Sequence, residues 1–478
     1  MEAAAAGATA AKKSKSDRIN AQEQQGSGNR DVEGRSLDLI SRLPDEVLGT
    51  VISLLPTRDG ARTQAISRRW RTLWRSAPLN LEADHDLSTQ DRKRVLFVSK
   101  ILAAHRGPAR RFALPGIRLR DRYAKIDGWL RSRALTGLRE MEFRYEIEDW
   151  LSPYPLPPSV FRFAPTLCVA VIGYCHFPNG MAPSLKFPCL KQLTLSVVTM
   201  SEDALHSLLS GCRVLESLLI SRNVGIARIR IRSQTLRSIG FSPAWDIQAS
   251  AVMFQELVIE DAPNLQRLLP LDPELGPANI RVLQAPKLDI LGTLSERISK
   301  IELGASVFQE MVAVSLTTSM HTVKVLVLGS AGPNLAIVVD FLKCFPCLEK
   351  LYIISRLKKN TKNVLRYNRL DPMECLELHL KKVVLKNYEG KRADVDFAKF
   401  FVLNAKKLKE MKFGVVNNCN DKWLASQRRR LQLDNRASPG ARFEFKSGVC
   451  NFFINNHTHD LWMADPFDSS LCRCCMRI

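Results

Sequence analysis

The chain has 478 residues, more than one ordinary hydrophobic core accommodates, and 45% of them are hydrophobic, so a small module joined to a larger or repetitive folded domain is expected. Its 70 basic and 48 acidic residues give a net charge of +22, which attracts acidic protein segments, phosphopeptides, inositol phosphates or nucleic acid. The sequence contains neither an apolar run near the roughly 20 residues of a membrane span nor a secretory leader, which predicts an intracellular protein without a membrane partner.

The N-terminal residues 1–35 are rich in Ala, Lys, Ser, Gln and Gly and lack apolar periodicity, which predicts a disordered basic tail. The short run Lys12-Lys13-Ser14-Lys15 fits either a nuclear-import patch or a solvated tail. The expected localisation is therefore the nucleus, the cytoplasm or both. The 12 cysteines are scattered through apolar segments, which is typical of reduced core thiols and not of a disulfide framework.

A helix is predicted to begin at Pro44, whose ring fixes φ and whose missing N–H is not needed in the first turn. Asp45 and Glu46 follow, where the helix dipole favours carboxylates. The apolar residues after them recur with helical spacing and form one face: Val47, Leu48, Val51, Ile52 and Leu55. Pro56 then ends the helix.

Two shorter helices are predicted next. Thr57 can cap the first of them, over residues 58–66, and Ser67 can cap the second. In that last helix the apolar positions are Trp70, Leu73 and Trp74. Three helices in about 40 residues make a very small core, so the module is expected to need a partner that covers its remaining apolar surface.

This stretch resembles the F-box in the form common in large plant families. The matching residues are Leu43-Pro44-Asp45-Glu46-Val47-Leu48, Ile52, Leu54-Leu55-Pro56-Thr57, Arg62-Thr63, Ser67-Arg68-Arg69-Trp70-Arg71 and Leu73-Trp74. Ala65 departs from the pattern, since a larger apolar residue is usual there. Periodicity alone also fits an unrelated amphipathic three-helix hairpin, and the match of residue types is what favours the F-box.

The resemblance implies that residues 36–82 dock on the Skp adaptor of an SCF (Skp–cullin–F-box) ubiquitin ligase. It also implies which residues form or support the adaptor-binding face: Leu43, Pro44, Leu48, Ile52, Leu55, Pro56, Trp70, Leu73 and Trp74.

A helix over residues 92–105 is predicted to link this module to a repetitive region. There, an apolar residue, two others, an apolar residue, one other and an apolar residue form a recurring unit. The first residues of its 12 copies are Leu138, Leu167, Leu190, Leu215, Leu236, Phe254, Ile280, Ile298, Val323, Leu348, Leu380 and Leu408. Their spacing suits leucine-rich repeats, which stack one strand per turn into a curved solenoid with a parallel sheet on the concave face. A set of unrelated amphipathic strands is the alternative.

Residues 254–291 look like the middle of plant F-box/leucine-rich-repeat proteins, and residues 380–411 look like the FBD domain of the same family. The FBD match rests on Val383, Leu385, Tyr388-Glu389-Gly390, Val395, Phe397-Ala398, Phe400-Phe401-Val402-Leu403, Asn404-Ala405 and Leu408. This segment is predicted as a strand, a turn at glycine, a buried helix and a further strand, which would close the solenoid.

The predicted organisation is therefore the tail 1–35, the F-box 36–82, the leucine-rich-repeat solenoid 90–370, an FBD-like cap 371–413 and a C-terminal extension 414–478. The fold class is α/β.

The C-terminal extension holds residue types that bind metals or lipids. Its cysteines and histidines are Cys450, His457, His459, Cys472, Cys474 and Cys475. The close pairs are adjacent or one residue apart, whereas structural zinc prefers a separation of about two to four, so no metal site is predicted. The last four residues have the length of a prenylation box, but Arg477 stands where an aliphatic residue is required. Plain reduced thiols are favoured, and a palmitoylated, membrane-associated scaffold is an alternative.

Arg228, Arg230 and Arg232 alternate with two isoleucines, so one strand would show guanidinium groups on one face. These arginines are candidates for binding an acidic or phosphorylated target, and a solvated face is the alternative. Aromatic residues are only 7% of the chain and no nucleic-acid-binding motif accompanies the charge, which disfavours base-specific readout.

The sequence contains no nucleophile elbow, phosphate loop or paired-carboxylate motif, so no catalytic residues and no cofactors are predicted. By resemblance, the chain is expected to be the substrate-recognition subunit of an SCF ubiquitin ligase, with the F-box bound to the Skp adaptor and through it to cullin. The repeats would bind a target protein. The alternative function is a basic solenoid that binds phosphorylated or nucleic-acid partners without ligase assembly.

Overall fold

The computed structural model describes residues 39–82, 91–117, 122–145, 154–244, 252, 254–272, 279–355, 373–416, 420–447 and 457–468. The chain divides into two units, 1–44 and 45–478. The described part of the first unit holds one short 3-10 turn, η1 (Ile40–Arg42), after which the Leu43 N–H donates to the Ile40 carbonyl at 3.1 Å. The predicted tail, 1–35, lies outside the described residues.

The second unit begins with the helices α1 (Asp45–Leu54), α2 (Thr57–Arg62) and α3 (Arg68–Ser76), with the 3-10 turn η2 (Thr63–Ala65) before α3. Ser67 caps α3 as predicted, because its hydroxyl accepts a hydrogen bond from the Trp70 N–H. The predicted cap at Thr57 is wrong. Its hydroxyl instead donates to the Asn80 carbonyl at 2.8 Å and accepts from the Glu82 N–H at 2.6 Å, which ties the start of α2 to the first strand.

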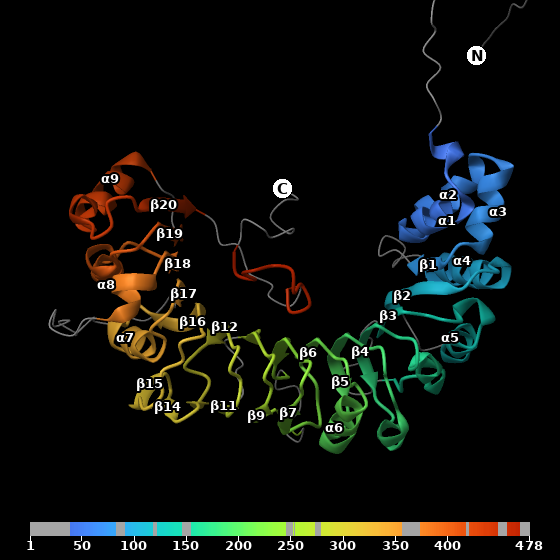
Figure 1. The fold of residues 1–478 in the computed structure, drawn as a ribbon, viewed down its shortest axis with the longest axis horizontal. Coiled ribbons are helices and arrows are strands. Elements are labelled where there is room, and N and C mark those ends of the chain that lie inside the picture. Colours follow the sequence, from blue (N-terminus) through green and yellow to red (C-terminus); the bar gives the residue numbers. More distant parts are fainter. Residues whose placement is uncertain are drawn as a thin grey trace, which may run out of the picture. The chain divides into compact units, whose positions relative to one another are not determined.

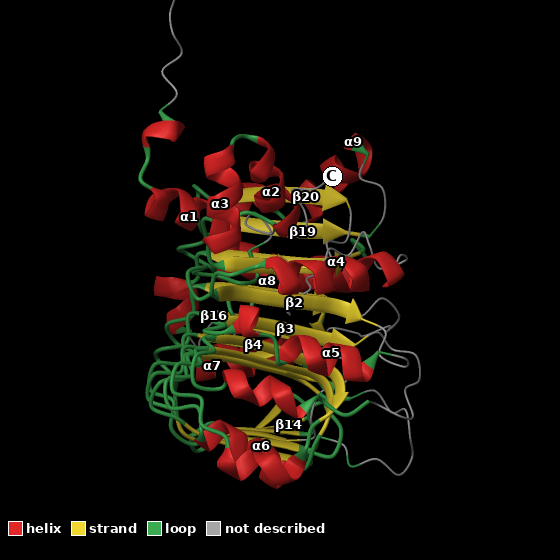
Figure 2. Cartoon of the chain, turned by 90° about the vertical axis from the view of Figure 1, so that its right-hand side faces the viewer, coloured by secondary structure: helices red, strands yellow, loops and turns green. Residues whose placement is uncertain are grey.

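A parallel sheet of 14 strands forms the body of this unit. In spatial order its strands are β1 (Leu79–Glu82), β2 (Ala109–Ile117), β3 (Glu140–Tyr145), β4 (Val169–His176), β5 (Gln192–Thr199), β6 (Ser217–Ser221), β8 (Ser238–Ser242), β10 (Arg267–Pro270), β12 (Ile290–Leu294), β16 (Val325–Gly332), β17 (Lys350–Ser355), β18 (Lys382–Tyr388), β19 (Glu410–Val415) and β20 (Arg442–Ser447). Figure 2 shows these strands stacked with their arrowheads pointing the same way.

A second sheet of six strands lies on the other side of the core. Its strands, in chain order, are β7 (Arg228–Arg232), β9 (Glu256–Asp261), β11 (Asn279–Val282), β13 (Lys300–Leu303), β14 (Ser306–Gln309) and β15 (Val312–Ser315). The first four pair in parallel and the last two add as antiparallel strands. Between β6 and β16 the chain therefore alternates between two sheets, so that strands replace the helices of other turns.

Helices cover the rest of the outer side. They are α4 (Asp91–Ala104), α5 (Tyr123–Leu130), α6 (Glu202–Ser210), α7 (Leu335–Cys344), α8 (Arg392–Asn404) and α9 (Asp421–Arg430), and the short turns are η4 (Arg133–Leu135), η5 (Pro158–Phe163), η6 (Asn179–Ser184), η7 (Cys375–His379) and η8 (Leu433–Asn435). Within this unit the strands follow an arc, with the 14-stranded sheet on its inner face (Figure 1). The predicted α/β solenoid with a parallel sheet on the concave face is confirmed. None of the described helices has the length and apolar content to cross a membrane.

The FBD-like segment folds as predicted, with strand β18, a turn at Gly390, helix α8 and strand β19. Gly390 has φ +73°, and a Cβ there would lie 2.7 Å from the side-chain nitrogen of Gln427. The sheet continues past residue 413, because β20 pairs with β19 and the Phe413 and Phe445 rings stack at 4.3 Å. The main core lies between the large sheet and the outer layer of helices and strands.

Candidate functional site

The predicted adaptor-binding residues separate into a buried group and an exposed group. Leu48, Ile52, Trp70 and Leu73 are 1–7% exposed and pack together with Ala77 as the core of the three-helix module. Trp74 packs against this core and makes an edge contact with the His105 ring at 5.7 Å. These side chains therefore support the module from inside.

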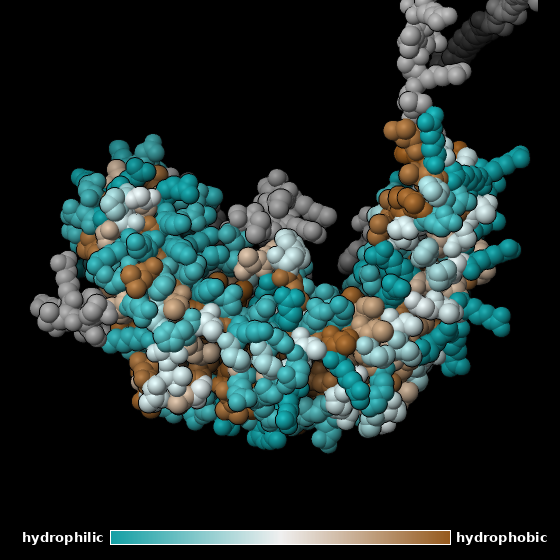
Figure 3. Space-filling model, in the orientation of Figure 1, coloured by the Kyte–Doolittle hydropathy of each residue, from teal (hydrophilic) through white to brown (hydrophobic). Residues whose placement is uncertain are grey.

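The exposed group includes Leu43 and Pro44 in the first unit and Pro56 in the second, while Leu55 is half-buried. Apolar residues outside the predicted adaptor-binding set are also exposed. Val47, Val51 and Leu54 of α1 are 43%, 43% and 58% exposed and follow i, i+4, i+7 spacing, so they form a second apolar face of this helix. Ile66 is 63% exposed. Figure 3 shows hydrophobic surface near α1.

Val47, Val51 and Leu54 are called the α1 ridge below. The neighbouring helices α2 and α3 carry exposed arginine side chains: Arg58, Arg62, Arg68, Arg69, Arg71 and Arg75. Asp45 takes one of them in an exposed ion pair, with Arg69 Nη2 at 2.5 Å from its carboxylate. An apolar ridge on a module with many exposed arginines suits a protein partner whose surface combines apolar and acidic side chains.

The concave face of the large sheet changes character along the arc. Near its start the inward side chains are charged and paired, with Arg111 3.4 Å from Glu140 and 3.1 Å from Glu142. In the middle they are small and polar, and the register places Ser217 beside Ser238 and Ser221 beside Ser242. Farther along they are apolar: Leu269, Ile290, Val325, Val327, Tyr352 and Val384 form a cluster separate from the main core. This set is called the concave apolar cluster below.

Residues 457–468 lie across this face (Figure 1), and they are called the C-terminal segment below. His459 lies between two hydroxyls, with Thr194 Oγ1 2.7 Å from its Nε2 and Ser217 Oγ 2.5 Å from its Nδ1. Burial lowers the pKa of His459 to about 4, so its ring is neutral near pH 7. Thr458 is fully buried above Gly240, where a Cβ would lie 2.3 Å from the threonine hydroxyl.

Arg267 of β10 holds the backbone of the C-terminal segment. Its guanidinium donates to the carbonyls of Asp460 at 3.0 Å, Leu461 at 3.2 Å and Met463. Only 4% of Arg267 is exposed, and this burial lowers the pKa of the guanidinium. An arginine so deeply buried requires acceptors, and these three carbonyls supply them.

The end of the C-terminal segment is held by a carboxylate and a ring. The Asp465 carboxylate accepts hydrogen bonds from Lys350 Nζ and Tyr352 Oη, both at 2.8 Å. Phe467 is 2% exposed, joins the concave apolar cluster and lies 5.8 Å from the Tyr352 ring. The hydrogen bond with Asp465 and burial raise the pKa of Tyr352, burial being the larger cause.

The arginines predicted as target-binding candidates lie on the second sheet and not on the concave one. Arg228, Arg230 and Arg232 are exposed on β7 and alternate with buried isoleucines, as the sequence predicts. Arg228 pairs with Glu256 at 2.6 Å. Arg230 and Arg232 line a cavity of about 470 Å³ between α6 and β7, together with Arg213 and His206. Their role in binding stays a prediction.

The histidines of the C-terminal extension do not form a metal group in the described residues, since His459 contacts hydroxyls and His457 lies 3.2 Å from the Asp460 carboxylate. The cysteines at 450, 472, 474 and 475 lie outside the described residues. The described cysteines are free thiols, and burial raises the pKa of Cys212 to about 12, which keeps it protonated.

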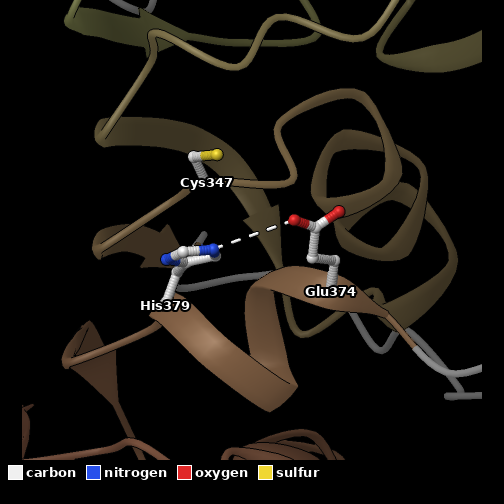
Figure 4. A group of neighbouring side chains, drawn as sticks. All are labelled: Cys347, Glu374 and His379. Atoms are coloured by element: carbon white, nitrogen blue, oxygen red, sulfur yellow. Dashed lines mark ion pairs between the residues drawn. The ribbon is translucent and has the colours of Figure 1, made fainter.

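Cys347, Glu374 and His379 are the described residues that could hold a metal ion, since their ligand atoms lie within 4.8 Å of one another. Figure 4 shows Glu374 and His379 facing each other at the two ends of η7, with Cys347 beside them. The imidazole and the carboxylate are already paired at 3.8 Å, and Glu374 is half-exposed. No sequence motif marks this group, because Cys347 lies 27 residues before Glu374.

Comparisons with known proteins match three parts of the chain. The F-box domain family matches residues 40–82, the family described as FBD-associated F-box protein At5g56370, LRR repeats, matches residues 126–353, and the FBD family matches residues 368–413.

Among its relatives in Arabidopsis thaliana, F-box/FBD/LRR-repeat protein At3g26920 is 26% identical over 81% of this chain and 93% of its own length. FBD-associated F-box protein At5g56370 is 30% identical over 39% of this chain and 44% of its own length. The chain spans under half the length of the curated relatives that it matches at 30% identity. The chain thus matches family models for an F-box, leucine-rich repeats and an FBD region in this order, and it is similar to F-box/FBD/LRR-repeat proteins of Arabidopsis thaliana.

Proposed function

We propose that this protein is the substrate-recognition subunit of an SCF ubiquitin ligase, in which the F-box binds a Skp-type adaptor and the leucine-rich repeats bind a target protein. The observation that carries the proposal is the α1 ridge inside the F-box match. Leu48 and Ile52 fill the core of the module, whereas Val47, Val51 and Leu54 stay exposed and available to a partner. A module this small is stabilised when a partner covers such a ridge.

In this role the chain performs no chemistry of its own. The adaptor connects it to cullin, and the concave sheet holds a target protein near the ubiquitin-charged enzyme of the complex. Binding both proteins at once raises the effective concentration of the target lysines at the site of transfer.

The test is capture of the full-length chain by an immobilised Skp adaptor. We expect the wild type to bind and the variant Val51→Asp/Leu54→Asp to lose binding, because two carboxylates on the α1 ridge would be buried against the adaptor. Val314→Asp is the matched control, since Val314 is 62% exposed on β15, far along the chain from the F-box. A wild type that is not captured, or a ridge variant captured as well as the control, rules out the proposal.

A second candidate function has its own observation. The cavity between α6 and β7 gathers Arg213, Arg230, Arg232 and His206, a set that suits a phosphate group. A basic solenoid that binds phosphorylated partners without a ligase would use this cavity. Phosphopeptide binding that is unchanged in the α1 ridge variant and lost in Arg230→Glu/Arg232→Glu would support it, and equal binding by both variants would exclude it.

A further inference from the structure

The concave apolar cluster lies on the face of its strands that points away from the main core. The neighbouring residues Leu268, Leu291, Leu326 and Leu351 point into the main core, whereas Leu269, Ile290, Val325 and Tyr352 point to the concave side. Their exposed fractions are nevertheless at most 4%. A contiguous apolar patch of this kind on an open sheet face would be a binding surface. Here it is covered with the help of Phe467, which comes from the C-terminal segment.

The C-terminal segment contrasts with the rest of the chain in charge. It contains three aspartates and no lysine or arginine, within a chain of net charge +22. Its aspartates meet basic residues of the sheet: Asp465 lies 2.8 Å from Lys350, and Asp468 lies 3.1 Å from Lys382. The charges of segment and sheet are therefore complementary, as they are between binding partners.

The contacts resemble peptide recognition more than core packing. Residues 457–468 form turns and bends but no helix or strand, so their backbone carbonyls can accept hydrogen bonds from side chains of the sheet. Arg267 donates hydrogen bonds to three backbone carbonyls, so it fixes the path of the segment whatever its side chains are. Two side chains of the segment are recognised specifically. Asp465 is bound by Lys350 and Tyr352, and Phe467 packs into the concave apolar cluster.

We propose that the concave face from β10 to β18 is a groove for a protein segment that lacks helix and strand and carries an aspartate two residues before an aromatic residue, and that the C-terminal segment is its internal occupant. A target segment with this pattern displaces the C-terminal segment and takes over its contacts. The identity of the ligand as a ligase target rests on the proposed function, but binding in the groove does not require the adaptor. Because the internal occupant acts at an effective concentration in the millimolar range, a free target must bind tightly or through several contacts.

The experiment uses the full-length chain and a fluorescent peptide with the sequence of residues 457–468, followed by anisotropy. The wild type should bind this peptide weakly, because its own segment fills the groove. The variant Asp465→Ala/Phe467→Ala should bind it at least about 10-fold more tightly, because its own segment has lost two of its side-chain anchors. Trp462→Ala is the matched control: Trp462 is 66% exposed in the same segment, and its loss should leave peptide binding as in the wild type. A peptide with alanine at positions 465 and 467 should bind clearly more weakly than the unaltered peptide, because only the contacts of Arg267, His459 and Asp468 remain.

A second variant opens the groove from the sheet side. Gly240→Ala places a Cβ 2.3 Å from the Thr458 hydroxyl and should unseat the start of the segment, whereas Gly414→Ala meets no atom closer than 3.6 Å and serves as its control. Gly240→Ala should raise hydrogen exchange in residues 457–468 and leave the exchange of the strands unchanged.

Three results would overturn the inference. They are peptide binding that does not improve in Asp465→Ala/Phe467→Ala, loss of cooperative unfolding in that variant, and exchange that spreads into the strands in Gly240→Ala. The last two would make the segment a part of the core. Failure of adaptor capture with normal peptide binding would instead contradict the proposed function alone.

Discussion

Asp465 and Phe467 illustrate what a residue contributes when its partners are distant in sequence. The Asp465 carboxylate accepts hydrogen bonds from Lys350 and Tyr352, which precede it by 115 and 113 residues. In the sequence DLWMADPFD, the aspartate and the phenylalanine follow no periodicity that marks them. From the sequence, this region is therefore a candidate only for metal or lipid chemistry, and neither residue stands out.

His459 makes the seating of the C-terminal segment pH-dependent. Burial lowers its pKa to about 4, while the neighbouring Asp460 acts in the opposite direction. A released segment takes up a proton near pH 6.5, so the seating is at full strength above that pH and weakens as the pH falls toward 4, by about 2 kcal/mol at pH 5. Hydrogen exchange of residues 457–468, corrected for its intrinsic pH dependence, should be clearly faster at pH 5 than at pH 7.

The variant His459→Gln is the control for this pH dependence, because an amide can bond Thr194 and Ser217 without titrating. It should remove most of the difference between pH 5 and pH 7. Equal protection of the wild-type segment at the two pH values would contradict the assignment to His459.

Among the elements, α1 has two apolar faces with different roles. Its buried face stabilises the module, and its exposed face is the proposed binding surface. Leu48→Ala should destabilise the three-helix module by about 2–5 kcal/mol, because it opens a cavity beside Trp70 and Leu73. Val51→Ala should cost well under half of that, since Val51 is 43% exposed, yet it should weaken adaptor binding more. Hydrogen exchange of α1–α3 measures the first effect, and capture by a Skp adaptor under conditions where the module is folded measures the second. Equal losses of stability would contradict the two-face description.

The sequence predicts these two faces as one, because the apolar positions together fit one broad helical stripe: Val47, Leu48, Val51, Ile52 and Leu55. Periodicity shows which residues are apolar but not where the neighbouring helix packs. The position of α3 decides that Leu48 and Ile52 are covered while Val47 and Val51 remain exposed.

The periodicity of the strand repeat likewise does not tell which sheet a strand joins. Copies that begin at Phe254, Ile280 and Ile298 were expected in the same sheet as the others, but their strands β9, β11 and β13 belong to the second sheet. Both sheets bury alternate residues against one core, so their sequence patterns are the same. The strands β10 and β12 of the large sheet lie between these copies and were not recognised as repeats.

At the scale of the whole molecule, net charge affects association more than it affects the fold. With the C-terminal segment displaced, the chain of net charge +22 should attract an acidic peptide before contact is made. In Asp465→Ala/Phe467→Ala, the association rate of the 457–468 peptide should fall about 10-fold between 50 and 500 mM salt. The dissociation rate should change less than about 2-fold, because it depends on the buried contacts of Arg267 and the concave apolar cluster. Stopped-flow anisotropy measures both rates, and a salt effect confined to dissociation would contradict this account.

The local features of this protein are predictable from its sequence: the dense F-box pattern, the cap at Ser67, the glycine turn at Gly390 and the alternation of apolar residues in strands. These depend on residues within a few positions of one another, where backbone geometry and periodicity act directly. Three other features depend on how the chain packs: which strands share a sheet, which face of α1 stays exposed, and the position of an acidic segment near the C-terminus on the concave face of a basic chain. Those features depend on contacts between residues that are tens to hundreds of positions apart. Such contacts form only when the chain folds, and local sequence patterns do not predict them.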